Sequence, residues 1–128
     1  MKISFDFDET LSEPHVQKFA KELVDKGYDV WVVTARCNDN WNDDPQWIPE
    51  TSGNRDLYYI AEKVGIPHSK CLFTDGHLKD RKLVEHGFNY HFDNLIEEVE
   101  AAKKAGIISV LFGYGPEFEE FMTWKDKF

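Results

Sequence analysis

The sequence predicts an α/β protein whose core is a three-layer, doubly wound, mostly parallel five-stranded sheet without a cap domain. Short apolar runs rich in β-branched residues alternate five times with segments whose apolar residues recur at helical spacing. Such alternation is typical of strands joined by right-handed helical crossovers. A length of 128 residues fits a single domain, 1–128, that can bury its own core without disulfides.

The strands are expected where the apolar runs are shortest and most β-branched. The run DVWVVT is almost entirely apolar, as in a strand that is covered on both faces of a parallel sheet. The expected strands are residues 2–7, 29–34, 70–74, 90–93 and 107–112.

Four helices are expected between these strands. The first is capped by Ser12 and ended by Gly27, and the second runs from about Asn54 to Gly65. A short helix covers 79–86 and a longer one 95–105. The side chains expected to face the core are Val16, Phe19, Ala20, Leu23 and Val24 in the first helix, Leu57, Ile60, Ala61 and Val64 in the second, and Leu95, Val99 and Ala102 in the last.

Composition excludes several classes of function. A net charge of −9 argues against bulk nucleic-acid binding, which needs a basic surface. The sequence contains neither an apolar run that could span a bilayer nor the apolar core of a signal peptide, so we expect a soluble, cytoplasmic protein without a membrane partner. The two cysteines, Cys37 and Cys71, are far apart, and we expect reduced thiols.

Acidic residues gather where the parallel strands end. Asp6 and Asp8 flank Phe7 at the end of the first strand, and alternation along an extended chain predicts that both carboxylates point one way while Phe7 enters the core. Asp93 ends the fourth strand at the same edge. Three carboxylates this close would repel one another, and a hard divalent cation such as Mg²⁺ resolves the conflict. Because Mg²⁺ is usually bound by one or two carboxylates together with a substrate phosphate, the site implies a metal and an anion.

The residue types at this edge suit phosphoryl transfer. A carboxylate such as Asp6 can attack phosphorus, and a second acid, Asp8, can protonate the leaving oxygen and later activate water. The hydroxyl of Thr34 and the ammonium of Lys79 can hold the phosphoryl oxygens. Thr34 is the least distinctive of the four because threonine is common in strands.

Four segments together resemble the haloacid dehalogenase superfamily of phosphohydrolases, over roughly residues 2–112. They are FDFDET (5–10), VVTAR (32–36), Lys79 in DGHLKD, and HFDN (91–94). The resemblance implies that Asp6 is the nucleophile and Asp8 the general acid and base. It also implies that Mg²⁺ is held by Asp6, the backbone carbonyl of Asp8, and Asp93. Two residues depart from the family pattern: Glu9 stands where glycine is common, and Asn94 where many members have a second acid.

Alternatives remain for several polar residues. Lys82 and Arg81 compete with Lys79 as the phosphate-binding cation. Asn94 and Glu97 have the spacing of a helix capping box, and Glu97 or Glu98 could instead join the metal site. The histidines that show no ligand spacing, and that we interpret as structural or surface residues, are His77, His86 and His91.

Two irregular segments lie outside this pattern. The stretch 37–54 is longer than an ordinary connection and leaves from the Thr34 strand end, so we expect it to overhang the site, with Trp41 and Trp47 available to stack on a base. The tail 113–128 is expected to form a short helix from Pro116. Its aromatic residues weakly favour a homodimer over a monomer.

The function predicted from the sequence is a Mg²⁺-dependent phosphatase that forms an aspartyl-phosphate. Its expected substrate is a small phosphorylated metabolite, with a slight preference for nucleotides because of the two loop tryptophans. Two alternatives are a phosphotransferase, which would need a cap to exclude water, and a non-catalytic module that binds phosphorylated ligands through a metal.

Overall fold

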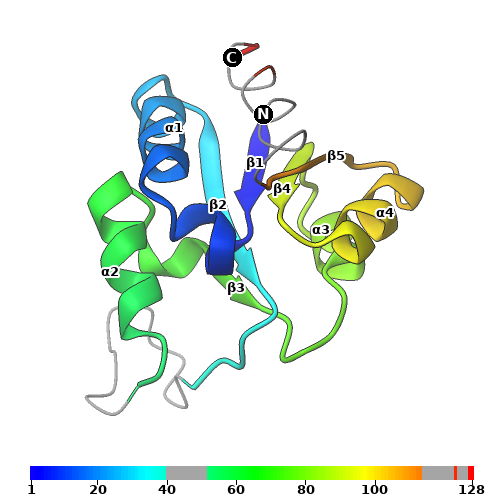
Figure 1. Ribbon diagram of the computed structural model, residues 1–128, viewed down its shortest axis with the longest axis horizontal. Coiled ribbons are helices and arrows are strands. Elements are labelled where there is room, and N and C mark those ends of the chain that lie inside the picture. Colours follow the sequence, from blue (N-terminus) through cyan, green and yellow to red (C-terminus); the bar gives the residue numbers. More distant parts are fainter. Residues whose placement is uncertain (40–51, 114–122, 124–126) are drawn as a thin grey trace.

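The computed structural model describes residues 1–39, 52–113, 123 and 127–128. Five parallel strands form one sheet in the order β3-β2-β1-β4-β5 (Figure 1). This confirms the predicted α/β class and the doubly wound parallel sheet. The strands are β1 (Lys2–Phe5), β2 (Asp29–Thr34), β3 (Cys71–Phe73), β4 (Tyr90–Asp93) and β5 (Ile108–Leu111).

Helices cover both faces of the sheet. The helices α1 (Pro14–Asp25) and α2 (Arg55–Val64) pack together on one face, and α3 (Asp80–Glu85) and α4 (Ile96–Lys104) lie on the other (Figure 1). Two short elements complete the described chain: a π-helical turn η1 (Phe7–Leu11) directly after β1, and a 3-10 turn η2 (His68–Lys70) before β3. Between β1 and β2 the chain forms only η1 and α1, and between β3 and β4 only α3, so no cap domain occurs at these two positions.

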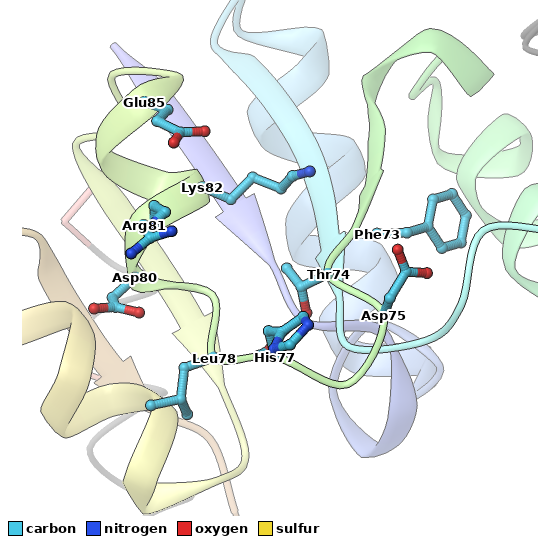
Figure 2. Close-up of a pocket in the computed structure, with 9 residues that line it drawn as sticks. All are labelled: Phe73, Thr74, Asp75, His77, Leu78, Asp80, Arg81, Lys82 and Glu85. Atoms are coloured by element: carbon cyan, nitrogen blue, oxygen red, sulfur yellow. The ribbon is translucent and has the colours of Figure 1, made fainter.

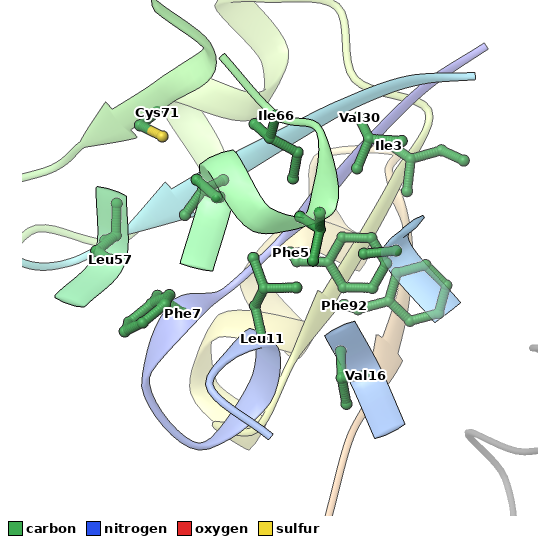
Figure 3. Packing of buried hydrophobic residues seen from close by; sticks show 14 of the residues in the cluster. Ile3, Phe5, Phe7, Leu11, Val16, Val30, Leu57, Ile66, Cys71 and Phe92 are labelled. Atoms are coloured by element: carbon green, nitrogen blue, oxygen red, sulfur yellow. The ribbon is translucent and has the colours of Figure 1, made fainter. Parts of the chain in front are cut away.

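The larger core lies between the sheet and the pair α1 and α2. Phe5 of β1 stacks on Phe92 of β4 with ring centroids 5.0 Å apart, and Phe19 of α1 contacts both rings edge-on. Figure 3 shows Leu11 and Val16 packed around this aromatic centre. Truncating such a buried phenylalanine costs about 3–5 kcal/mol, so this cluster fixes β1 beside β4.

The structure corrects three local predictions. Helix α1 begins at Pro14 rather than after Ser12, because a proline at the first helical position already has the φ that the helix needs; the Ser12 hydroxyl instead accepts a hydrogen bond from the Glu9 amide at 3.0 Å. Leu95 does not face the core but is 50% exposed, because it precedes α4 in an extended conformation. The first strand ends at Phe5, not at residue 7.

The two irregular segments are described only in part. Trp41 and Trp47 fall in 40–51, and the helix expected from Pro116 falls in 114–122, so both predictions lie outside the described residues. Both cysteines, Cys37 and Cys71, are free thiols. Within the part of the chain that the structure describes, every helix is too short or too polar to cross a membrane.

Candidate active site

The carboxyl-terminal edge of the sheet brings three charged side chains together below the surface. The Asp6 amide donates to the Phe92 carbonyl at 2.8 Å, which sets Asp6 beside Asp93 at the end of β4. The Lys79 ammonium lies 2.7 Å from Asp6 Oδ1 and 2.6 Å from Asp93 Oδ2. All three side chains are buried, so these contacts form in a medium that screens charge poorly.

Lys79 reaches this position because α4 holds its backbone. The Lys79 amide donates to Glu98 Oε1 at 3.0 Å, and the second Glu98 oxygen lies 3.7 Å from the Lys79 ammonium. Three buried carboxylates therefore surround one ammonium. Of the competing cations, Arg81 and Lys82 instead line a separate open pocket of about 650 Å³ between β3 and α3 (Figure 2). None of Asp6, Lys79 and Asp93 lines that pocket.

Charge and burial oppose each other in this cluster. Burial and the negative charge of Asp93 raise the pKa of Asp6 from its usual 3.8 to about 7, although Lys79 acts in the opposite direction. Burial also disfavours ionised Asp93, but hydrogen bonds from His91 and Lys79 outweigh it and lower the pKa of Asp93. Burial likewise disfavours the Lys79 ammonium, and the attraction of Asp6 and Asp93 outweighs it and raises the pKa of Lys79. Burial and the charge of Asp93 thus act against ionised Asp6, whereas the hydrogen bonds to Asp93 favour its ionised form.

Sequence reasoning missed His91 and Ser4 as members of the site. His91 is fully buried, with Nδ1 2.7 Å from Ser4 Oγ and Nε2 2.8 Å from Asp93 Oδ2. Burial lowers the pKa of His91 and keeps the ring neutral, so we assign its proton to Nε2, which donates to Asp93. The available signal in the sequence was a polar residue between apolar neighbours in each strand, Ser4 between Ile3 and Phe5 and His91 between Tyr90 and Phe92; the structure sets the two opposite each other.

Asp8 lies outside the buried cluster. Phe7 enters the core as predicted, but the chain then turns through Glu9 at a left-handed φ of 60°, and Asp8 is left exposed. The ion-pair partner of Asp8 is Arg36, whose Nε and Nη2 donate to its two oxygens at 2.9 and 2.7 Å. The structure therefore does not give Asp6 and Asp8 the shared environment that simple strand alternation predicts.

Thr34 ends β2, the strand beside β1, and its side chain is buried. Its hydroxyl oxygen accepts a hydrogen bond from the Arg36 amide at 3.2 Å. The Asp6 carboxylate receives its own hydroxyl donor from Thr10, at 3.2 Å from Oδ2. Thr34 thus lies at the expected sheet edge, where it supports the chain that leads to Arg36.

Glu9 and Asn94, the two residues that depart from the family pattern, contact each other. The Asn94 side-chain amide donates to Glu9 Oε2 at 2.9 Å and so ties the turn after β1 to the end of β4. The predicted capping box is wrong, because α4 begins at Ile96 and Asn94 lies too early to cap it. Asp93 Oδ1 accepts from the Leu95 amide instead, at 3.1 Å, and Glu97 is exposed.

The donors at this edge suit a hard divalent cation in type and charge. Three carboxylates face one ammonium, so when all four groups are ionised the cluster carries more negative than positive charge. In the described arrangement Lys79 lies between Asp6 and Asp93, and the described residues contain no ready-made group of three metal ligands. A cation would therefore bind by sharing the Asp6 and Asp93 carboxylates with Lys79.

Comparison with known proteins adds evidence on the fold. No family model matches this sequence, and no curated protein matches it. Among solved structures, the chain is similar to an uncharacterized protein from Corynebacterium glutamicum, at 16% identity and a TM-score of 0.57 over 96% of this chain and 90% of the other. A hypothetical protein from Pyrococcus horikoshii aligns at 17% identity and a TM-score of 0.37, over 87% of this chain and 41% of the other. The first likeness supports the α/β fold.

Proposed function

We propose that this protein is a Mg²⁺-dependent phosphomonoester hydrolase of the haloacid dehalogenase type. The observation that carries the proposal is the Asp6–Lys79–Asp93 cluster at the carboxyl edge of the sheet, where α/β proteins bind ligands. The order of the four motif segments supports it. The proposed substrates are small phosphorylated metabolites, nucleotides among them.

In this mechanism Asp6 is the nucleophile. Lys79 and Thr10 each hold one of its oxygens and so fix the carboxylate at the strand end. Attack of Asp6 on phosphorus forms an aspartyl-phosphate and breaks the bond to the leaving oxygen. Asp8 protonates that oxygen and then takes a proton from the water that hydrolyses the acyl phosphate.

The remaining residues of the cluster balance charge. Lys79 neutralises part of the negative charge that Asp6 and the phosphoryl group bring together. Mg²⁺ would be held by Asp6 and Asp93, with the backbone carbonyl of Asp8, and when bound it supplies further electrostatic stabilisation of the phosphoryl oxygens. His91 and the Leu95 amide keep Asp93 in place for this task.

The test is phosphate release from an aryl phosphate with and without Mg²⁺. We expect the native protein to turn over only with the metal and Asp6→Asn to be inactive, because an amide is a poor nucleophile. Asp8→Asn should accumulate a phosphate adduct on residue 6, visible by mass spectrometry, because hydrolysis of the adduct lacks its base. Asp25→Asn, which changes an exposed carboxylate in α1, is the matched control and should keep full activity.

Other outcomes identify the alternative functions. Release that requires an added hydroxyl acceptor would indicate a phosphotransferase. Mg²⁺-dependent binding without release would indicate a binding module. Substantial turnover by Asp6→Asn, or an adduct on another residue, would contradict the proposed mechanism.

A further inference from the structure

Arg36 makes an unusually complete set of contacts around the proposed acid and base. Its Nε and Nη2 donate to both oxygens of Asp8, and its Nη1 and Nη2 donate to both oxygens of Asp56 in α2, at 2.8 and 3.0 Å. The guanidinium carbon also lies 4.9 Å from the ring centre of Phe7, the residue between Asp6 and Asp8. The Arg36 side chain is 23% exposed, whereas Asp8 and Asp56 are more than half exposed.

The backbone of Arg36 is also held in place. The Arg36 amide donates a hydrogen bond to the Thr34 hydroxyl, which fixes the start of the Arg36 side chain at the end of β2. The hydrogen bonds that the guanidinium donates to Asp56 and then to Asp8 raise the pKa of Arg36 further above its usual value, so the guanidinium stays charged. Three elements thus meet at one side chain: the turn η1, the end of β2 and the start of α2.

We propose that Arg36 is the positioning residue for Asp8, holding the carboxylate of the general acid and base through a planar two-point contact that is braced on Asp56 and Phe7. This inference rests on the proposed function and deepens it. Asp8 lies on an exposed turn and follows a buried phenylalanine, so its backbone alone leaves the carboxylate free to rotate. A planar guanidinium that donates hydrogen bonds to both Asp8 oxygens removes that freedom, which the single ammonium of a lysine could not do.

Misplacing a catalytic group by about 1 Å can cost about 100-fold in rate. In the first step, formation of the adduct, the loss should depend on the leaving group, because only a poor leaving group needs a proton from Asp8; in the second step, hydrolysis of the adduct, Asp8 is needed as the base whatever the leaving group was. We therefore expect Arg36→Met to slow single-turnover release of an alkyl leaving group about 10- to 100-fold and release of an activated aryl leaving group less than about 3-fold, and to slow hydrolysis of the adduct equally after both substrates. Arg36→Lys keeps the positive charge but cannot donate to both Asp8 oxygens in the same planar geometry. Its losses should therefore resemble those of Arg36→Met.

A double-mutant cycle tests whether Arg36 acts through Asp8. In an Asp8→Ala background, Arg36→Met should change single-turnover release of the alkyl leaving group less than about 2-fold, because the group that it positions is gone. Asp56→Asn should give a smaller loss with the same leaving-group dependence. Lys21→Met, which removes an exposed cation from α1, is the control. Equal losses in both backgrounds, or equal slowing of the release step on both substrates, would overturn the proposal.

Crystal structures of the native protein, Arg36→Met and Arg36→Lys supply a readout that needs no activity. We expect the Asp8 carboxylate to be ordered against Arg36 in the native protein and displaced or disordered in both variants, with the Asp6–Lys79 contact retained. An Asp8 carboxylate that keeps its native position in Arg36→Met would overturn the positioning role. If the native protein released no phosphate, the proposed function would fail, and these structures would still decide the role of Arg36.

Discussion

At the residue scale, the site depends on an imbalance of charge below the surface. Asp6, Asp93 and Glu98 share the single ammonium of Lys79, and the neutral His91 adds a hydrogen bond but no charge. Buried carboxylates without full compensation are costly, so this arrangement is poor for stability. It suits a site whose remaining negative charge is balanced when a cation binds.

The raised pKa of Asp6 predicts how stability depends on pH in the metal-free protein. Between the unfolded value of about 3.8 and the folded value of about 7, the folded state holds a proton that the unfolded chain has lost. The contribution of Asp6 to stability is therefore complete below pH 3.8 and is lost as pH rises through 7, with a slope of at most about 1.4 kcal/mol per pH unit.

Urea unfolding at intervals from pH 4 to pH 8 measures this slope. Asp6→Asn cannot ionise and should flatten the curve in that range, whereas Asp25→Asn, in an exposed ion pair, should leave it unchanged. A slope that survives Asp6→Asn would assign the proton to another group. Saturating Mg²⁺ should also reduce the slope, because a bound cation favours the ionised carboxylate.

At the element scale, the site depends on where elements end. Strand β1 stops at Phe5, and the turn η1 then separates the buried Asp6 from the exposed Asp8. Helix α4 reaches across to α3 and fixes the Lys79 amide through Glu98. Most element types and positions follow from apolar periodicity, but these endings depend on contacts between distant residues, which periodicity does not contain.

Helix α2 ends at Val64, and the capping residue that follows, Gly65, predicts how tightly α1 and α2 pack. Gly65 has a φ of 93°, and a Cβ there would lie 3.0 Å from Val24 Cγ1 of α1; Gly27 has a similar φ of 90° with no atom within 4 Å. Both Gly→Ala changes cost conformational energy, but only Gly65→Ala also crowds a neighbour. We expect Gly65→Ala to lower the free energy of unfolding by about 1 kcal/mol more than Gly27→Ala.

Denaturant unfolding of the two variants at the same pH measures that difference. Because both positions need the same left-handed backbone, their difference isolates the crowding between α1 and α2. Equal losses would mean that Val24 moves away without cost. In that case the contact between these helices would be looser than the structure indicates.

At the scale of the whole molecule, the sequence predicts the layers and the edge of the sheet that carries the polar residues. It also places Asp6, Lys79 and Asp93 at that edge, because parallel strands end together. It does not predict the buried His91 or the pairing of Asp8 with Arg36, since both depend on which side chains meet after folding.

Phe128 packs at the amino-terminal edge of the sheet, near the start of β1 and opposite the edge that carries Asp6 (Figure 1). Its ring centre lies 5.2 Å from Tyr90, 5.7 Å from Tyr28 and 6.0 Å from Phe19, and its carbonyl accepts a hydrogen bond from the Lys26 ammonium at 2.8 Å. Aromatic pairs of this kind add about 0.5–1.5 kcal/mol beyond burial.

We therefore expect Phe128→Ala to lower the free energy of unfolding by about 1–3 kcal/mol, measured by urea denaturation. Tyr59→Ala, which removes an aromatic ring that is 69% exposed, should change it by less than about 0.5 kcal/mol. Because Phe128 packs at the strand edge opposite Asp6, phosphate release by folded Phe128→Ala should equal that of the native protein. A lower kcat at a temperature where the variant is fully folded would show that packing at one edge of the sheet is coupled to the catalytic edge.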